Sequence, residues 1–289
     1  MRAYTALVAL SALGLATAAP APAQLPFLSS PPSPHFATTN STPVHLQLAV
    51  MSRCPDAQLC EAVFDRVLEQ RTDVQGDKVL VGELVDVELV FIARPNSTAT
   101  YGVTCMHGDL ECRGNIQELC AAKHWAEGEK GGRKEGEGSE SGEEEGVEVM
   151  VGGLKGERGW EGWWNFLQCL NYGETGSIGT DAKAKECAKV VGRTWDGPVA
   201  ACVDSHEGRD LLLASVKEAQ KLEATKSCTM LLEGKQVCIH DGTWKSCPGG
   251  HEVGDFVRLI KDDFQRLNPP KKEEESEEDD EEEEWVMLQ

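Results

Sequence analysis

The chain has 289 residues and a formal net charge of -21, from 49 acidic against 28 basic side chains. Acidity on this scale disfavours a nucleic-acid-binding function, because binding along phosphates requires a basic surface. Residues 44–126 and 160–267 lie outside low-complexity sequence and together are long enough for one domain with a hydrophobic core.

The N-terminus is typical of a signal peptide. Arg2 precedes an apolar run over 6–16, and small residues follow through Ala23. We therefore expect a leader over 1–23 and a Pro/Ser/Thr-rich linker over 24–43. The apolar run is shorter than the roughly 20 residues that a membrane helix needs. No later stretch reaches that length, so the sequence predicts no transmembrane segment.

Export through the secretory route determines what the eleven cysteines indicate. In an oxidising compartment they predict disulfides rather than metal ligands. Because eleven is odd, at least one thiol is free, reactive or paired with another chain. Two triplets, Asn40-Ser41-Thr42 and Asn96-Ser97-Thr98, make Asn40 and Asn96 the expected N-glycosylation acceptors.

Apolar periodicity predicts an α/β domain over 44–267. Residues 44–51 alternate apolar and polar side chains, which is typical of a half-buried strand, and 84–92 is a second strand candidate. Between them, a helix-like segment carries Ala62, Val63, Val67 and Leu68 on one face. The order is that of a thioredoxin-like domain. It is completed by a helix over 211–222, a strand over 228–232, a turn at Glu233-Gly234-Lys235, a strand over 236–240 and a helix over 256–267.

Most of the net charge lies in two acidic runs, 127–148 and 271–284, which together carry fifteen net negative charges. The first interleaves Gly and Glu with almost no apolar residues, so it cannot bury enough surface to offset its ordering entropy. We expect a disordered insertion over 127–158 that interrupts the domain. The second run belongs to an expected disordered acidic tail over 268–289.

An aromatic cluster follows the insertion. We interpret it as the point where the chain rejoins the core and buries aromatic area, rather than as a binding surface. The cluster consists of Trp160, Trp163, Trp164, Phe166 and Leu167.

The most specific motif spans residues 105–120, Cys-Met-His-Gly-Asp-Leu-Glu-Cys-Arg-Gly-Asn-Ile-Gln-Glu-Leu-Cys. It resembles the signature of the gamma-interferon-inducible lysosomal thiol reductase (GILT) family: C-Q-H-G, two residues, E-C, two residues, N, four residues, C. Met106 replaces the family's glutamine. The positions that agree are Cys105, His107, Gly108, Glu111, Cys112, Asn115 and Cys120.

The resemblance continues to the hairpin around Gly234 and the last helix. It implies a thioredoxin-like fold with a helical, disulfide-rich insertion. It also implies the family activity, reduction of protein disulfides in acidic endolysosomal compartments. The further cysteines that it includes are Cys169, Cys187 and Cys202.

Three cysteines within sixteen residues are best explained as disulfide staples that hold an otherwise irregular insertion. Their connectivity cannot be read from the sequence. The alternative is a zinc site made of Cys105, His107, Cys112 and Cys120, but oxidation after export competes with metal for those thiols. His107 and Glu111 either hold the loop through hydrogen bonds or contribute to the surface around a thiol.

The reactive cysteine of a thioredoxin-like domain lies where the first strand gives way to the first helix, because free N–H groups and the helix dipole there favour a thiolate. This chain has Cys54-Pro55-Asp56-Ala57-Gln58-Leu59-Cys60 at that junction, with five residues between the cysteines where the family has two. A helix beginning at Pro55 would separate the pair by about 9 Å, and a disulfide needs Cα atoms within about 7 Å. A Cys54–Cys60 bond therefore requires a loop between them and a helix that starts near Cys60.

Two further residues are expected at the site. Asp56 lies between the two cysteines and disfavours the thiolate unless its charge is neutralised. The resemblance also implies a cis-proline before the strand that faces the site, and counting back from Gly234 places Cys228 there. Cysteine does not enforce a cis bond. Cys228 is then either a third thiol of the site or the disulfide partner of Cys54 or Cys60, in which case the site becomes a structural staple.

The leading hypothesis is a thiol-disulfide oxidoreductase that reduces protein disulfides in the secretory or endolysosomal (vacuolar) lumen. Cys54, the more exposed sulfur, attacks the substrate, and Cys60 resolves the mixed disulfide. We expect no cofactor and no bound metal, disulfide-containing proteins as partners, and a local disulfide between Cys238 and Cys247. The alternative is a non-catalytic secreted binding protein that keeps the GILT-like fold and uses its cysteines as staples. The oligomeric state stays open.

Overall fold

A computed structural model describes residues 41–125 and 161–270. The predicted leader, the linker up to residue 40, the Gly/Glu insertion and the tail from residue 271 lie outside the described residues, as do Asn40 and Trp160. Within the described part, no helix combines the length and the apolar character that crossing a membrane requires.

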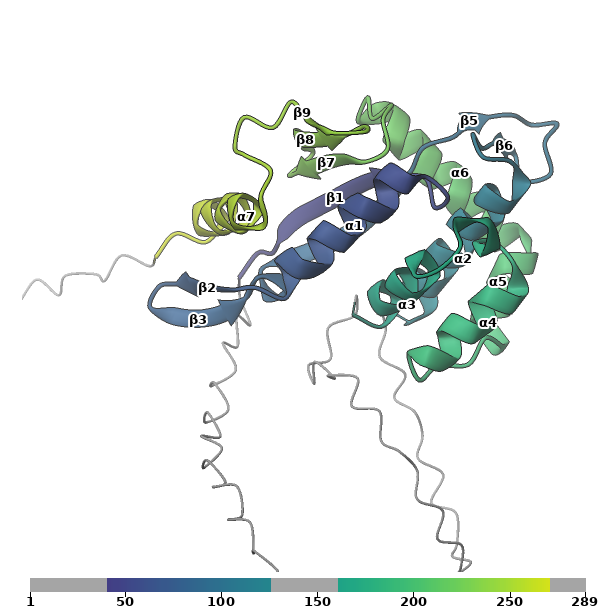
Figure 1. Ribbon diagram of the computed structural model, residues 1–289, viewed down its shortest axis with the longest axis horizontal. Helices are drawn as coiled ribbons and strands as arrows, with labels where there is room; N and C mark the ends of the chain where they lie inside the picture. The colour runs from purple at the N-terminus through teal and green to yellow at the C-terminus, as the bar shows by residue number, and fades with distance from the viewer. Residues whose placement is uncertain (1–40, 126–160, 271–289) are drawn as a thin grey trace, which may run out of the picture. The chain divides into compact units, whose positions relative to one another are not determined.

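A five-stranded mixed sheet forms the centre of the domain, in the order β4-β1-β7-β8-β9. The central strand β1 (Val44–Val50) pairs in parallel with β4 (Val85–Phe91) and antiparallel with β7 (Thr229–Leu232). A hairpin turn joins β7 to β8 (Lys235–His240), and β9 (Trp244–Lys245) closes the edge. Strand β1 is buried along almost its whole length, not half-buried as its alternating pattern predicted, because helices cover both faces of the sheet (Figure 1).

The connection from β1 to β4 contains helix α1 (Pro55–Leu68), because two parallel strands need a long crossover. Pro55 occupies the first helical position, where its missing N–H costs nothing. A small hairpin of β2 (Arg71–Val74) and β3 (Asp77–Leu80) and a short 3₁₀ turn, Val81–Glu83, complete the crossover. The apolar pattern did not predict this hairpin.

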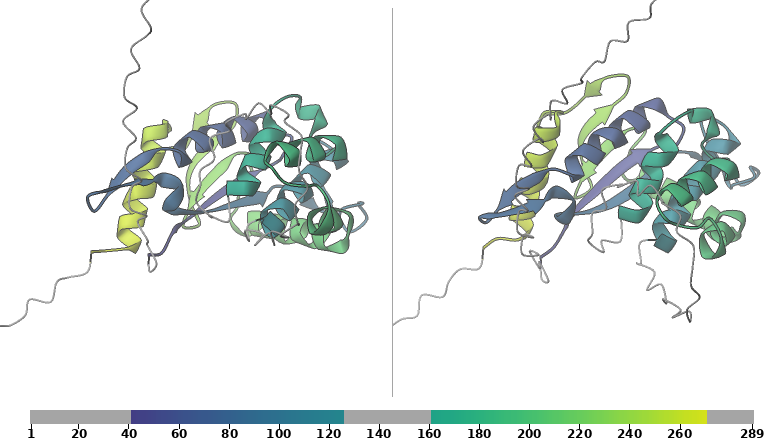
Figure 2. Two further views of the ribbon diagram at one scale, coloured as in Figure 1. Left: turned by 90° about the horizontal axis from the view of Figure 1, so that it is seen from below. Right: turned by 60° about the horizontal axis from the view of Figure 1, so that its bottom comes forward.

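Helices cover both faces of the sheet (Figures 1 and 2). On one face, α1 and the last helix α7 (Val253–Leu267) pack together through Phe64 and Phe256, whose ring centroids lie 5.1 Å apart. On the other face, helix α6 (His206–Lys221) lies against β4. The buried cluster between this helix and the sheet consists of Ala49, Val90, Ala219, Ala224 and Leu231.

A helical segment is inserted between β4 and β7. It begins with a short hairpin of β5 (Arg94–Pro95) and β6 (Val103–Thr104) and ends with α6. Trp163, Trp164 and Phe166 are all buried, which confirms the interpretation of the aromatic cluster as core. The helices of the insertion before α6 are α2 (Asp109–Trp125), α3 (Glu161–Asn171), α4 (Asp181–Val190) and α5 (Gly197–Asp204), with a 3₁₀ turn at Thr175–Ser177.

The strand order, the β1–α1–β4 crossover and the final hairpin followed by α7 are those of a thioredoxin-like domain with a helical, disulfide-rich insertion. This confirms the predicted fold class. Two local expectations were wrong. The cysteine signature is not an irregular staple loop, because most of it lies on α2. Helix α6 begins five residues before the predicted Leu211, because Ser205 caps its N-terminus and accepts a hydrogen bond from the Glu207 N–H.

Candidate active site at the start of α1

Cys54 lies where β1 gives way to α1 and is the N-cap residue of that helix. Its carbonyl accepts the first helical hydrogen bond, from the Gln58 N–H at 3.1 Å, and its own N–H donates to the Met51 carbonyl. It is the free cysteine among the described residues. Cys54 is the more exposed cysteine of its motif, as expected, but it is only 7% exposed, and its thiol contacts the carbonyl oxygen of Ser227 at 3.9 Å.

The second cysteine of the motif has a different partner. Cys60 is bonded to Cys228, across 168 residues of sequence, with Cα atoms 6.2 Å apart. Helix α1 begins at Pro55, so no loop separates Cys54 from Cys60 and the two do not bond. In a pattern with two intervening residues, the second cysteine would fall at position 57, where the chain has the fully buried Ala57. Cys60 is therefore not available as a free resolving thiol in this state.

The peptide bond between Ser227 and Cys228 is cis, at the position where the resemblance implied a cis-proline. One contact holds this segment against the Cys54 loop, and a second ties it to the end of β8. The Ser227 hydroxyl accepts a hydrogen bond from the Met51 N–H at 3.0 Å. Cys228 and His240 exchange both backbone hydrogen bonds, at 2.9 and 2.8 Å. Residues 227 and 228 thus face the junction of β1 and α1.

Asp56 has partners that were not anticipated. One carboxylate oxygen, Oδ1, accepts from the Gly242 N–H at 2.8 Å and lies 2.7 Å from Nδ1 of His240. The His240 contact lacks hydrogen-bond geometry, so it is an ion pair when the imidazole is protonated. These contacts fix the Asp56 carboxylate, two residues after Cys54, to the turn between β8 and β9. The sequence analysis missed His240 and Ser227. A hairpin centred on Gly234 places residue 240 opposite residue 228, so counting outward from the turn would have identified His240.

The cysteine signature supports the loop that presents Cys54. The Asn115 side chain accepts a hydrogen bond from the buried Ser52 N–H at 3.0 Å, and the Ser52 hydroxyl donates to the Glu111 carbonyl. Arg53 donates to the carbonyl of His107. His107 itself is hydrogen-bonded to the Glu111 carboxylate through its ring and its N–H. Of the two roles left open for His107 and Glu111, the structure favours holding the loop.

Two glycines of the signature segment have structural roles: Gly108 through its backbone conformation and Gly114 through close packing. Gly108 has φ +86°, a conformation that favours glycine, just before α2 begins. A Cβ atom at Gly114 would lie 2.7 Å from the Ser52 hydroxyl. The signature helix therefore approaches the Cys54 loop at a glycine.

The other cysteines form four disulfides, so the thiols of the proposed zinc set are already bonded. The expected Cys238–Cys247 bond is present. Among the described residues one group of three side chains brings potential metal ligands together, His124, Cys202 and Glu207, but the Cys202 sulfur is also in a disulfide. The four bonds are Cys105–Cys112, Cys120–Cys202, Cys169–Cys187 and Cys238–Cys247.

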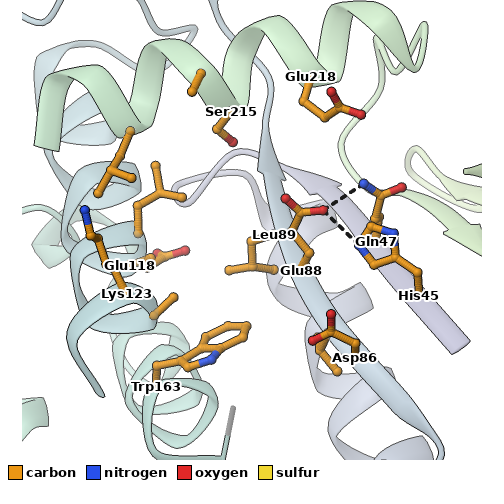
Figure 3. Close-up of a pocket in the computed structure, with 15 residues that line it drawn as sticks. His45, Gln47, Asp86, Glu88, Leu89, Glu118, Lys123, Trp163, Ser215 and Glu218 are labelled. Carbon is orange, nitrogen blue, oxygen red and sulfur yellow. Dashed lines mark hydrogen bonds and ion pairs between the residues drawn. The ribbon is translucent and has the colours of Figure 1, made fainter. Parts of the chain in front are cut away.

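A separate cavity of about 770 Å³ lies where α2 and α6 leave part of the sheet uncovered (Figure 3). On the sheet side, the Glu88 carboxylate accepts from Gln47 Nε2 at 2.8 Å and contacts His45 Nε2 at 3.0 Å. The Glu118 side chain lines the cavity from α2, and neither of its oxygens has a hydrogen-bond partner. No cysteine lines this cavity, so it is distinct from the thiol site.

Two buried carboxyl groups have strongly perturbed acidity. Burial raises the pKa of Glu61 to about 8, and a hydrogen bond from the Asn171 amide at 2.6 Å opposes the shift. Burial also raises the pKa of Glu118 well above its ordinary value, and the charges of Glu61 and Glu111 add to that shift. Both groups therefore stay protonated in the folded protein in acidic solution.

Several solved structures of thiol-disulfide proteins are similar, but with TM-scores below 0.5, so the fold assignment rests on the strand order and connectivity described above. They include a putative protein disulfide isomerase from Nitrosomonas europaea (8% identity, TM-score 0.44, covering 78% of this chain and 100% of that chain). They also include the thiol-disulfide oxidoreductase MdbA from Corynebacterium diphtheriae (13%, 0.43, 76% and 85%) and DsbA from Mycobacterium tuberculosis (12%, 0.41, 78% and 83%).

No curated protein sequence matches the chain. A family model does: residues 45–134 match the one described as gamma interferon inducible lysosomal thiol reductase (GILT). The matched segment contains Cys54, Cys60 and the whole signature from Cys105 to Cys120, and it ends before Cys228. The resemblance predicted from the cysteine signature is thus confirmed as a match to this family model over residues 45–134.

Proposed function

We propose that the protein is a thiol-disulfide oxidoreductase that reduces disulfide bonds of protein substrates, with Cys54 as the attacking sulfur. The observation that carries this proposal is the place of that thiol. It is unbonded, caps the N-terminus of α1 directly after β1 in the segment that matches the GILT family model, and contacts the Ser227 carbonyl oxygen. Backbone N–H groups at a helix N-terminus stabilise a negative sulfur, which is the nucleophile in disulfide exchange.

The reaction begins when the Cys54 thiolate attacks one sulfur of a substrate disulfide. A bond forms between Cys54 and that sulfur, the substrate S–S bond breaks, and the other substrate sulfur leaves as a thiolate that takes up a proton. A second thiol must then attack the mixed disulfide to release the remaining substrate sulfur. Completing one reduction thus consumes two thiols.

A second candidate function has specific support. Cys54 is 7% exposed, and Cys60 is closed in a disulfide with Cys228, so this state presents no surface dithiol. A secreted, disulfide-stapled binding protein that keeps the fold without catalysis fits those two observations. We place it second because it leaves the unbonded Cys54 thiol without a role.

Reduction of insulin disulfides with dithiothreitol as the reductant separates the two functions. The protein should be produced through a secretory route, so that its disulfides form. We expect the wild type to accelerate insulin reduction and Cys54→Ser to reduce the rate to that of dithiothreitol alone. Removal of the Cys169–Cys187 bond by the double change Cys169→Ser/Cys187→Ser is the control for general loss of a disulfide. Equal activity of Cys54→Ser and wild type would overturn the catalytic proposal.

We also infer that the protein acts in the secretory or endolysosomal (vacuolar) lumen, with residues 44–267 as the folded domain. Five disulfides among the described residues support an oxidising destination. Asn96 lies in the β5–β6 hairpin, partly exposed, which suits a glycosylation acceptor. Expression in a secreting cell should give a glycosidase-sensitive mass that decreases in Asn96→Gln; an unchanged mass would exclude a glycan at that residue.

A further inference from the structure

We propose that Cys228 is the resolving cysteine of this protein and that the Cys60–Cys228 bond is the redox-active disulfide of its oxidised state. This inference rests on the proposed function, and it concerns the source of the second thiol. It corrects the expected assignment of Cys60 as the residue that resolves the Cys54 mixed disulfide.

Cys228 is the cysteine that adjoins both of the others. The Cys54 thiol contacts the carbonyl oxygen of Ser227, which belongs to the cis peptide leading into Cys228. Cys60 is bonded directly to Cys228. Cys54 and Cys60, by contrast, lie six residues apart on one helix, about 9 Å along its axis, which is too far for a disulfide. Thiol–disulfide exchange between Cys60 and Cys54 therefore has to pass through Cys228.

Proximity makes an internal thiol the effective one. The segment that carries Cys228 is held against the Cys54 thiol, which contacts the Ser227 carbonyl oxygen. A neighbouring thiol held by the fold acts at a high effective concentration. Position 57, where the usual second cysteine would lie, holds Ala57, so no thiol on the first turn of α1 competes for this role.

The cycle balances in four steps. A small-molecule dithiol first reduces Cys60–Cys228 to two thiols and is itself oxidised to a disulfide. After Cys54 has attacked the substrate, the Cys228 thiolate attacks the Cys54 sulfur; the Cys54–Cys228 bond forms, and the second substrate sulfur leaves as a thiolate. The Cys60 thiolate then attacks the Cys228 sulfur, which forms Cys60–Cys228 and releases the Cys54 thiolate. The products are two substrate thiols and the state seen in the structure, with Cys54 free.

Single substitutions separate the steps. In Cys228→Ala, the Cys54–substrate mixed disulfide should accumulate, and turnover with dithiothreitol should fall by about ten-fold or more, because the internal thiol is lost. In Cys60→Ala, a Cys54–Cys228 bond should accumulate after one turnover. Trapping with acid and alkylation, followed by peptide mass spectrometry, identifies each species. The double variant Cys169→Ala/Cys187→Ala should turn over at the wild-type rate.

A rescue variant guards against misfolding as the cause. Ala57→Cys restores a thiol three residues after Cys54, within disulfide reach on a helix. We expect Ala57→Cys/Cys228→Ala to recover most of the turnover lost in Cys228→Ala. Inactivity of Cys54→Ser together with full activity of Cys228→Ala would overturn this inference and leave the proposed function intact. Full activity of Cys54→Ser would overturn both.

Wild-type protein provides an independent measurement. In glutathione buffers of decreasing potential, Cys60 and Cys228 should become available to an alkylating reagent together, before the other four disulfides open and while the protein remains folded by circular dichroism. A Cys60–Cys228 bond that opens only with global unfolding would contradict a redox-active role.

Discussion

At the scale of single residues, Asn115 connects the cysteine signature to the loop that presents Cys54. Its side-chain oxygen accepts the Ser52 N–H, and both residues are buried. Asn115→Ala leaves that N–H without a partner and should lower the free energy of unfolding by roughly 1–3 kcal/mol. The loop should also loosen, so that Cys54 reacts faster with an alkylating reagent. Denaturant unfolding and the alkylation rate of the folded protein measure the two effects.

Asn165→Ala is the matched control, because Asn165 is an exposed residue on α3. We expect a change of at most about 0.5 kcal/mol there, as for other surface positions. If Asn115→Ala behaved like Asn165→Ala in both measurements, the signature would not support the Cys54 loop.

At the scale of elements, the disulfides of the insertion differ in the length of chain that they close. Cys120–Cys202 joins α2 to α5 across 82 residues, whereas Cys105–Cys112 closes only 7. In the chain-entropy account, loss of the first should cost about 4 kcal/mol and loss of the second about 2 kcal/mol. Thermal unfolding of Cys120→Ala/Cys202→Ala and Cys105→Ala/Cys112→Ala tests this order. The reverse order would show that local strain, not chain entropy, dominates.

Most strands of the central sheet and two of its helices can be predicted from the sequence. The strands β1, β4, β7 and β8 and the helices α1 and α7 follow from their apolar periods, because each has one or two buried faces. Pro55 is a good first helical residue and does begin α1, but the sequence left open a loop that would allow a Cys54–Cys60 bond. The partner of Cys60 could be narrowed only to alternatives, of which Cys228 was one, because the choice depends on how β7 is placed beside β1, 168 residues further along the chain.

Other elements lacked a periodic signal. The β2–β3 hairpin has only four residues in each strand, too few for a clear alternation, although the Gln75-Gly76 turn between them is a hairpin signal. The helical start of the signature was hidden because its buried face includes polar residues, Glu111, Asn115 and Gln117, which hydrogen-bond to neighbouring segments. On this helix, the residues that support the site are polar at positions where an apolar pattern would place core side chains.

At the scale of the whole molecule, the buried Glu61 and Glu118 should make stability depend on pH. The unfolded chain releases the Glu61 proton near pH 4.5, whereas burial keeps that carboxyl protonated to about pH 8 in the fold. Its contribution to stability is therefore complete below pH 4.5 and is lost as the pH rises towards 8. Burial acts on Glu118 in the same direction. The stability that these two groups contribute in acid suits the endolysosomal lumen proposed above.

Glu61→Gln tests this dependence, because glutamine keeps an oxygen acceptor for the Asn171 amide and cannot ionise. At about 1.4 kcal/mol per pKa unit, the wild type should lose on the order of several kcal/mol of unfolding free energy between pH 4.5 and 8, and the variant clearly less. Denaturant unfolding across that range gives both slopes, and Glu69→Gln, at an exposed position after α1, should follow the wild type. Parallel slopes for Glu61→Gln and wild type would mean that Glu61 is already ionised in the fold, and the acid preference would then have to come from Glu118 or from elsewhere in the chain.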